Sequence, residues 1–199
     1  KPGYKPSWVP PRPVAYKLEG EMERQIDGML NAGIIEPCLS DSNWNSPIFL
    51  TKKKNGSYRF ICDLRGLNEQ ILDDNFPLEN LNHILDKVNG DCIFSTCDFS
   101  QSFFQVPYDR DSRPYTAFTY KNRRYQFCNM TMGNKTSSSK FTRMMTRLLA
   151  NVPISHLFYF IDDLMLSSRD TRSHIRSIEL LLQRLSQASL KLKPQKCEF

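Results

Sequence analysis

The sequence of 199 residues predicts an α+β fold, and three observations support this prediction. The pair Asn55-Gly56 separates two short strand-like runs, which is a strong hairpin signal. Two apolar runs flank Asp162-Asp163 and predict a second hairpin, built from buried strands. Regular apolar stripes over 136–149 and 171–188 predict amphipathic helices. The chain therefore combines antiparallel strands with helices that cover them.

Composition and charge restrict the class of protein. Hydrophobic residues make up 40% and charged residues 24% of the chain, as in an ordinary globular domain. No apolar run approaches the ~20 residues of a membrane span, so no membrane partner is expected. The net charge of +6 favours a polyanionic partner. The 6 cysteines form no C-x-x-C pair, which argues against zinc and favours reduced thiols in the cytoplasm.

The N-terminal part begins with an arm and continues with a helix. Residues 1–16 are rich in proline and carry basic residues, which predicts an extended basic arm rather than a packed element. From 18 to 32 the apolar residues fall on one helical face, and Gly33 supplies the residue that commonly ends a helix. These features predict a first helix over 18–32.

The hairpin predicted over 48–62 carries an unusual number of cations near its tip. They are Lys52, Lys53, Lys54 and Arg59. One interpretation is charge that keeps an exposed sheet edge soluble. The other is a clamp for phosphates, because several cations on one hairpin can close over a polyphosphate.

The rest of the chain alternates strands and helices. Apolar spacing between 78 and 89 predicts a second helix, and 92–97 has the composition of a buried strand that leads into Asp98. A strand pair is expected over 115–120 and 123–128, followed by the helix over 136–149 and the hairpin around Asp162-Asp163. After the helix over 171–188, the alternation over 190–194 predicts an edge strand.

Three carboxylates are the strongest candidates for chemistry. Taken alone, Asp162-Asp163 could be an acidic turn and Asp98 a strand terminator. If the three carboxylates lie together at the ends of buried strands, they can bind two Mg²⁺ ions, or Mn²⁺ as a substitute. Two such ions can stabilise both the attacking and the leaving oxygen of a phosphoryl displacement. Asp98, Asp162 and Asp163 are therefore the expected catalytic and metal-binding residues.

A series of short motifs follows in order along nearly the whole chain. They are Ala32-Gly33-Ile34-Ile35-Glu36-Pro37, Trp44-Asn45-Ser46-Pro47, Asp63-Leu64-Arg65, Phe76-Pro77-Leu78, Phe160-Ile161-Asp162-Asp163 and Lys196-Cys197-Glu198-Phe199. In this order and spacing they resemble the reverse transcriptases of gypsy-type LTR retrotransposons. The resemblance implies the fingers and palm of a right-hand polymerase, with an antiparallel palm sheet backed by the two helices over 136–149 and 171–188.

The resemblance also assigns roles to individual positions. Asp98 and Asp162 would bind metal with the backbone carbonyl of Phe99, and Asp163 would be the less tightly engaged carboxylate. The residues that would bind the nucleotide are Lys54, Arg59, Gln101, Ser102, Phe103 and Met132. Phe103 would stack under the sugar and exclude a 2′-hydroxyl, although it could instead be a core residue. Lys196 would protonate the leaving pyrophosphate, with a solvated lysine as the alternative.

The resemblance implies a division of the chain and a set of partners. Residues 1–16 would be the arm, 17–91 the fingers and 92–199 the palm, with fingers residues near 110–135 interleaved. The thumb, connection and RNase H are expected to lie outside this chain, in the rest of a Pol polyprotein. The expected partners are an RNA template, a DNA primer/template duplex and dNTPs, in the cytoplasm within retroelement particles.

The implied function is RNA-directed DNA polymerase, a nucleotidyltransferase that extends a primer 3′-hydroxyl. Two rivals are weighed against it. Residues 130–140 depart from the family's Pro-Phe-Gly-Leu and Asn-Ala-Pro pattern. This departure motivates the first alternative, a weakened or inactive remnant that binds nucleic acid. A two-metal phosphodiesterase would use the same carboxylates. The sequence offers no His or Glu base near either acidic motif, which argues against it.

Overall fold

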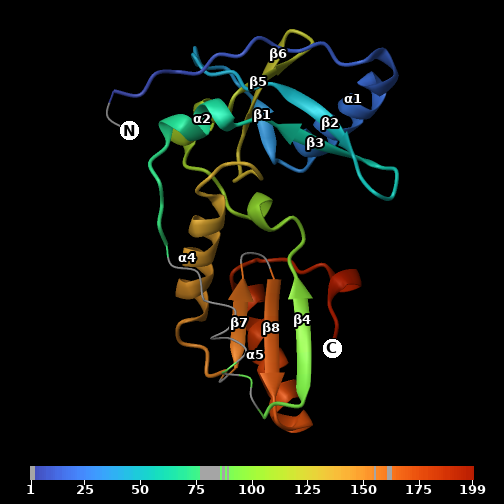
Figure 1. The fold of residues 1–199 in the computed structure, drawn as a ribbon, viewed down its shortest axis with the longest axis vertical. Helices are drawn as coiled ribbons and strands as arrows, with labels where there is room; N and C mark the ends of the chain where they lie inside the picture. The colour runs from blue at the N-terminus through green and yellow to red at the C-terminus, as the bar shows by residue number, and fades with distance from the viewer. Residues whose placement is uncertain (1–2, 77–85, 87, 89, 155, 161–162) are drawn as a thin grey trace. The chain divides into compact units, whose positions relative to one another are not determined.

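The computed structural model describes residues 3–76, 86, 88, 90–154, 156–160 and 163–199. They belong to two compact units, and each unit is built from two separate stretches of chain (Figure 1). The first unit comprises 1–73 and 106–137, and the second comprises 74–105 and 138–199. Most of the helix expected between 78 and 89 lies outside the described residues. In the described part of the chain, no helix is long and apolar enough to cross a membrane.

In the first unit, helix α1 (Tyr16–Asn31) confirms the first predicted helix. It buries Met22, Ile26 and Met29, which are members of the predicted apolar stripe. Gly33 follows with a φ of +66°, a conformation that glycine adopts without steric cost. The arm is extended, as expected, but it packs against this unit. The Val9 N–H donates to the Asn45 carbonyl at 2.9 Å, and the Tyr4 ring stacks on Trp44.

The hairpin predicted around Asn55-Gly56 is present as strands β2 (Ile48–Lys52) and β3 (Tyr58–Cys62). The strands pair antiparallel from Ile48 opposite Cys62 to Lys52 opposite Tyr58. Gly56 has a φ of +84°, which explains why the turn requires glycine. A short helix, α2 (Arg65–Gln70), follows the hairpin and was not predicted.

The second sheet of this unit joins strands that are far apart in sequence. Its order is β1 (Ile35–Pro37), β6 (Arg123–Phe127) and β5 (Phe118–Tyr120), all antiparallel. The predicted strand pair is thus confirmed, with the positive-φ residues Lys121 and Asn122 at its turn. Strand β5 is shorter than the strand predicted over 115–120. Residues Arg110–Thr116 instead form a 3₁₀ helix, η2, that contains Pro114.

The second unit is built on an antiparallel sheet of three strands (Figure 1). Strand β8 (Asp163–Ser168) lies in the middle, with β4 (Ile93–Asp98) on one side and β7 (Leu157–Phe160) on the other. Both the buried strand before Asp98 and the second predicted hairpin are therefore confirmed. The core-facing residues Cys97, Phe158, Leu164 and Leu166 are each less than 5% exposed.

Helices α4 (Ser137–Leu149) and α5 (Thr171–Gln187) match the predicted helices closely. Helix α4 buries Phe141, Met145 and Leu149, and the hydroxyls of Thr146 and Tyr159 join it to β7 at 2.8 Å. Asp170 caps the N-terminus of α5, because its side chain accepts a hydrogen bond from the Ser173 N–H. The helix lies behind the sheet in Figure 1. The fold is therefore α+β, with an antiparallel sheet and two helices that pack with it.

The C-terminal segment lies along the free edge of β4 (Figure 1). The edge strand predicted over 190–194 is wrong in extent, since only Leu192 forms a bridge, with Phe99. Pro194 then begins a 3₁₀ helix, η3 (Pro194–Lys196), because its ring fixes φ and removes a backbone donor. Beyond η3, Glu198 pairs with Thr96.

Candidate active site

The carboxylates of Asp98 and Asp163 come from directly opposite positions of two paired strands. Asp98 is the last residue of β4 and Asp163 the first of β8, and the antiparallel register places one opposite the other. Cross-strand partners project their side chains from the same face of a sheet, with Cβ atoms about 5 Å apart. The two side chains therefore project from the same face and the same end of the sheet. Asp162 lies outside the described residues, but it is the chain neighbour of Asp163.

Lys196 provides the positive charge next to Asp98. Its Nζ donates to Oδ2 of Asp98 at 2.6 Å, and the two side chains are 56% and 22% exposed. A cavity of about 650 Å³ opens here, and its lining includes Asp98, Phe160, Asp163 and Lys196. The structure therefore brings together three of the sequence-predicted site residues: Asp98, Asp163 and Lys196.

Carboxylate oxygens are the ligands that Mg²⁺ prefers in proteins. Asp98 and Asp163 supply such oxygens at one point of the sheet, and the ammonium beside Asp98 shows that a cation is accommodated there. Within the described residues, no group of three or more His, Cys, Asp or Glu side chains could hold a metal ion. The donor set of the two described carboxylates nevertheless suits a hard divalent cation.

The Phe99 carbonyl accepts no hydrogen bond from the bridge between Phe99 and Leu192. Phe99 pairs with Leu192, but the two hydrogen bonds of this pair come from flanking residues. Ser100 N–H donates to the Lys191 carbonyl at 2.9 Å, and Lys193 N–H donates to the Asp98 carbonyl at 2.8 Å. The Phe99 carbonyl is therefore not used by this pairing, which suits the predicted role of that carbonyl as a ligand.

Gln105 fixes this turn of the chain and was not singled out from the sequence. Its amide Nε2 donates to the Ser100 and Lys191 carbonyls at 2.7 and 2.9 Å, and its Oε1 accepts from the Lys191 N–H at 2.6 Å. One side chain thus joins the segment after Asp98 to the C-terminal segment. The Ser-Phe-Phe-Gln run at 102–105 gave no local signal for this contact, because its partner lies far along the chain.

The predicted nucleotide-binding residues after Asp98 lie in a tight turn. Gln101 has a φ of +52°, and Ser102 begins a 3₁₀ helix, η1 (Ser102–Gln105), in which it is 1% exposed. The half-buried Phe103 ring contacts Phe141 edge-on, with ring centroids 5.8 Å apart. Phe103 therefore combines a core contact with partial exposure.

Lys54 and Arg59 belong to the first unit, at the tip of the β2–β3 hairpin. A cavity of about 450 Å³ is lined by Thr51, Lys52, Lys53, Lys54, Asn55 and Arg59. Among the residues that the structure describes, none forms an ion pair with Lys54 or Arg59. Four cationic side chains thus line one open cavity, which an anion could enter.

Met132 also lies in the first unit, in the segment that departs from the family pattern. It is 46% exposed and is followed by Gly133, whose φ is +93°. Asn68 ties this segment down, because its Nδ2 donates to the Gly133 carbonyl at 2.7 Å and its Oδ1 accepts from the Lys135 N–H at 2.9 Å. The Asn68 side chain therefore anchors the loop at two points, Gly133 and Lys135.

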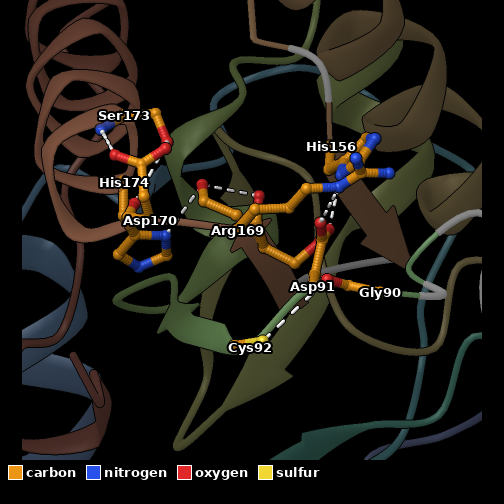
Figure 2. A network of polar contacts seen from close by, with 10 residues as sticks. Gly90, Asp91, Cys92, His156, Arg169, Asp170, Ser173 and His174 are labelled. Atoms are coloured by element: carbon orange, nitrogen blue, oxygen red, sulfur yellow. Dashed lines mark hydrogen bonds and ion pairs between the residues drawn. The ribbon is translucent and has the colours of Figure 1, made fainter.

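A polar network lies at the end of the β4–β8–β7 sheet that is farther from Asp98 (Figure 2). The Asp91 side chain has no exposed surface, and its Oδ2 accepts hydrogen bonds from His156 Nδ1 and, at 2.6 Å, from the Ser167 hydroxyl. Arg169 Nε lies 3.9 Å from Oδ1. The hydrogen bond from Ser167, followed by the interaction with His156, lowers the pKa of Asp91 below its usual value. This network, which the sequence did not reveal, joins the starts of β4 and β7 to the end of β8.

The sequence of the chain matches a known protein family and several of its members. Residues 51–199 match the family described as "Reverse transcriptase (RNA-dependent DNA polymerase)". The chain belongs to the reverse transcriptase family. Its similarity to a retrovirus-related Pol polyprotein from transposon 297 of Drosophila melanogaster is 34% identity over 192 residues, or 94% of this chain and 18% of that polyprotein. The polyprotein from transposon gypsy is 27% identical over 184 residues, which cover 89% of this chain and 18% of the relative.

Solved reverse transcriptases have the same fold. The prototype foamy virus protease-reverse transcriptase superposes with a TM-score of 0.88 at 26% identity, covering 99% of this chain and 26% of that one. The foamy viral enzyme in complex with an RNA/DNA hybrid gives a TM-score of 0.88 at 23% identity, with the same coverage of both chains. The resemblance to gypsy-type reverse transcriptases and the α+β fingers and palm fold are confirmed. This reverse transcriptase chain spans about a fifth of the curated relatives.

Proposed function

We propose that this chain is the catalytic core of an RNA-directed DNA polymerase that adds dNTPs to a primer 3′-hydroxyl. The observation that carries the proposal is the pairing of Asp98 with Asp163 across β4 and β8. In a member of the reverse transcriptase family, two carboxylates at such a position are available for two-metal nucleotidyl transfer. The proposal includes Asp162, the neighbour of Asp163, as the third carboxylate.

Asp98, Asp162 and Asp163 would hold the metal ions, together with the Phe99 carbonyl. Bound there, Mg²⁺ ions (or Mn²⁺) would activate the primer hydroxyl and neutralise charge on the phosphates. The chain itself contributes rigid placement, because the β4–β8 register and the Gln105 contacts fix the residues that would carry the ligands. Such preorganisation is a large part of catalysis by positioning.

The residues proposed to bind the nucleotide are those that the family resemblance assigns to this role. Lys54 and Arg59 would bind its triphosphate, since cationic side chains around one open cavity suit a polyanion. Gln101 and Ser102 would present backbone amides to the phosphates, and Phe103 would support the sugar. Met132 would contact the nucleotide from the segment that Asn68 fixes.

Lys196 would act as the general acid for pyrophosphate. Its ammonium already lies within hydrogen-bond distance of Asp98, so it is held next to the reacting groups. A positioned proton donor of this kind contributes roughly 10²–10⁴-fold to a reaction. In this proposal the ion pair with Asp98 orients Lys196 before the substrate arrives.

The proposed partners are an RNA template and a DNA primer/template duplex, with the remaining Pol polyprotein. The net charge of +6 suits polyanions, and the similar foamy viral structures hold double-stranded DNA or an RNA/DNA hybrid. The alternative remains an inactive remnant that binds nucleic acid. A location within intracellular retroelement particles would follow from the transposon relatives.

Primer extension on poly(rA)/oligo(dT) with the complete polymerase tests the proposal. The wild-type protein should incorporate dTTP only when Mg²⁺ or Mn²⁺ is present. Asp98→Asn and Asp162→Asn should abolish incorporation, because each removes a charged ligand, and they should leave duplex binding within about twofold. Glu179→Gln, an exposed carboxylate on α5, is the matched control and should keep full activity.

Two results would overturn parts of this proposal. Retained duplex binding without any metal-dependent synthesis by the wild-type protein would identify the inactive remnant. Unchanged incorporation by Asp98→Asn would reject the metal assignment, even if the polymerase were active.

A further inference from the structure

Two cysteines lie close together beside the candidate active site. Cys97 precedes Asp98 on β4, and Cys197 follows Lys196 at the end of η3. We propose that Cys97 and Cys197 form a redox modification site, in which hydrogen peroxide at low concentration oxidises the two thiols to a reversible disulfide. The bond would covalently join the strand that carries Asp98 to the segment that carries Lys196.

The backbone register places these two cysteines opposite each other. Thr96 N–H donates to the Glu198 carbonyl, and Glu198 N–H donates to the Thr96 carbonyl, both at 2.9 Å. This exchange defines a hydrogen-bonded antiparallel pair. One step along each strand, Cys97 therefore faces Cys197 at the non-hydrogen-bonded position. Cys197 keeps the extended conformation that this register requires, with a φ of −91° and a ψ of 135°.

The non-hydrogen-bonded position has the dimensions that a disulfide needs. Residues at such a position have Cα atoms about 4.5 Å apart, closer than hydrogen-bonded partners. A disulfide is compatible with Cα separations of roughly 4.4–6.8 Å. The bond between Cys97 and Cys197 can thus form without separating β4 from the C-terminal segment.

The two thiols differ in their surroundings, which sets the order of reaction. Cys97 is only 3% exposed, so its thiol is shielded from solvent and from dissolved oxidants. Cys197 is only partly buried, and its Sγ lies 3.4 Å from the Lys193 carbonyl. The more accessible Cys197 would therefore meet the oxidant first, and the buried Cys97 would resolve it.

The oxidant is hydrogen peroxide, which balances the reaction. The Cys197 thiolate attacks one peroxide oxygen, an S–O bond forms as the O–O bond breaks, and the departing hydroxide takes a proton to become water. Cys97 sulfur then attacks the sulfenic sulfur, so the S–S bond forms and the S–O bond breaks. The second hydroxide takes the Cys97 proton and leaves as water. Both thiols are oxidised and one peroxide is reduced, and a dithiol reverses the modification.

Thiol counting on the full chain tests the proposal directly. The reduced protein is treated with one equivalent of hydrogen peroxide under native conditions, and free thiols are then titrated in denaturant. The wild-type protein should lose two thiols per chain and regain them with dithiothreitol. The Cys197→Ser protein, which is altered at the partly exposed position, should not show this loss of two thiols. A loss of two thiols by Cys197→Ser would overturn the proposal.

Peptide mapping identifies the bond. Trypsin leaves Cys92 and Cys97 on one peptide, so the mapping is done in a Cys92→Ser background as well. The peptide that begins at Cys197 should be linked to this peptide in both the wild-type and the Cys92→Ser proteins. Linkage that disappears with Cys92→Ser, or linkage of Cys197 to any peptide other than that of Cys97, would reject the pair. Neither readout requires polymerase activity, so failure here leaves the proposed function untouched.

Discussion

The Nζ atom of Lys196 donates a 2.6 Å hydrogen bond to Oδ2 of Asp98. This contact joins residues that are nearly a hundred positions apart, and it depends on the pairing of the C-terminal segment with β4. A lysine in this position can act as a proton donor or simply as a counter-charge. The two roles lead to different expectations for its variants.

Lys196→Met should lower the rate of incorporation by about 10²-fold or more if Lys196 is a general acid. Duplex binding should stay near that of the wild-type enzyme, because only one charge is lost. Single-turnover primer extension measures the effect, and Lys193→Met, an exposed neighbour, serves as control. If Lys196→Met changes the affinity for metal but leaves the maximal rate of incorporation unchanged, Lys196 is only a counter-charge.

Phe103→Ala should lower discrimination against ribonucleotides by about 10-fold or more, because removal of the ring opens space beside the sugar. The change also removes an edge-on contact with the fully buried Phe141, so some loss of stability is expected. Incorporation of dTTP and UTP on the same primer gives the ratio. Phe104→Ala is the matched control. If the ratio stays constant while the melting temperature falls, Phe103 is a core residue.

Lys54→Ala should raise the apparent KM for dNTP by roughly 10- to 100-fold, which corresponds to a charge-assisted hydrogen bond. The cavity that it lines contains three further cations, so a smaller effect would indicate that these share the phosphate. Steady-state kinetics at saturating duplex measures the change. Lys17→Ala, an exposed lysine on α1, should leave KM unchanged.

Asp91 predicts a specific dependence of stability on pH. Its pKa is lowered from 3.8, so the charged form is favoured in the folded state. The stabilisation is therefore present in full above the unfolded value and is lost as the pH falls through the folded one. The melting temperature of Asp91→Asn should lie below that of the wild type at pH 7. This gap should shrink below about pH 4, where the wild-type carboxylate becomes protonated.

Thermal unfolding from pH 7 to pH 3 measures this gap. Asp41→Asn, an exposed carboxylate, is the control and should follow the wild-type curve. A gap that stays constant into strong acid would show that the hydrogen bonds of Asp91 do not depend on its charge. The test uses no enzymatic readout.

The parts of the fold that could be predicted are those determined by neighbouring residues. Asn55-Gly56 fixes the β2–β3 turn, and the apolar stripe of α4 buries Phe141 and Met145 as expected. The apolar runs around Asp162-Asp163 likewise formed β7 and β8. In each case the signal lies within a few residues of the structure that it specifies.

Features that depend on distant pairing could not be predicted. Strand β1 has three residues and ends in proline, so only its pairing with β6 makes it a strand. Pro194 ended the predicted edge strand, and Glu198 resumed the pairing beyond it. The contacts of Gln105 and of Asp91 also join segments that carry no local mark of each other. Of the candidate site, the sequence supplied the carboxylates but not the contacts that hold them.

The discontinuity of both compact units has a consequence for synthesis on the ribosome. Strand β4 emerges long before β8, the strand that pairs with it in the centre of the sheet, and before the C-terminal residues that cover its other edge. The nascent chain must therefore hold an unpaired strand while the rest of the first unit is being made. Exposed strand edges promote association between chains. The timing of translation, as well as the final contacts, should limit how much of this polymerase core reaches its native state.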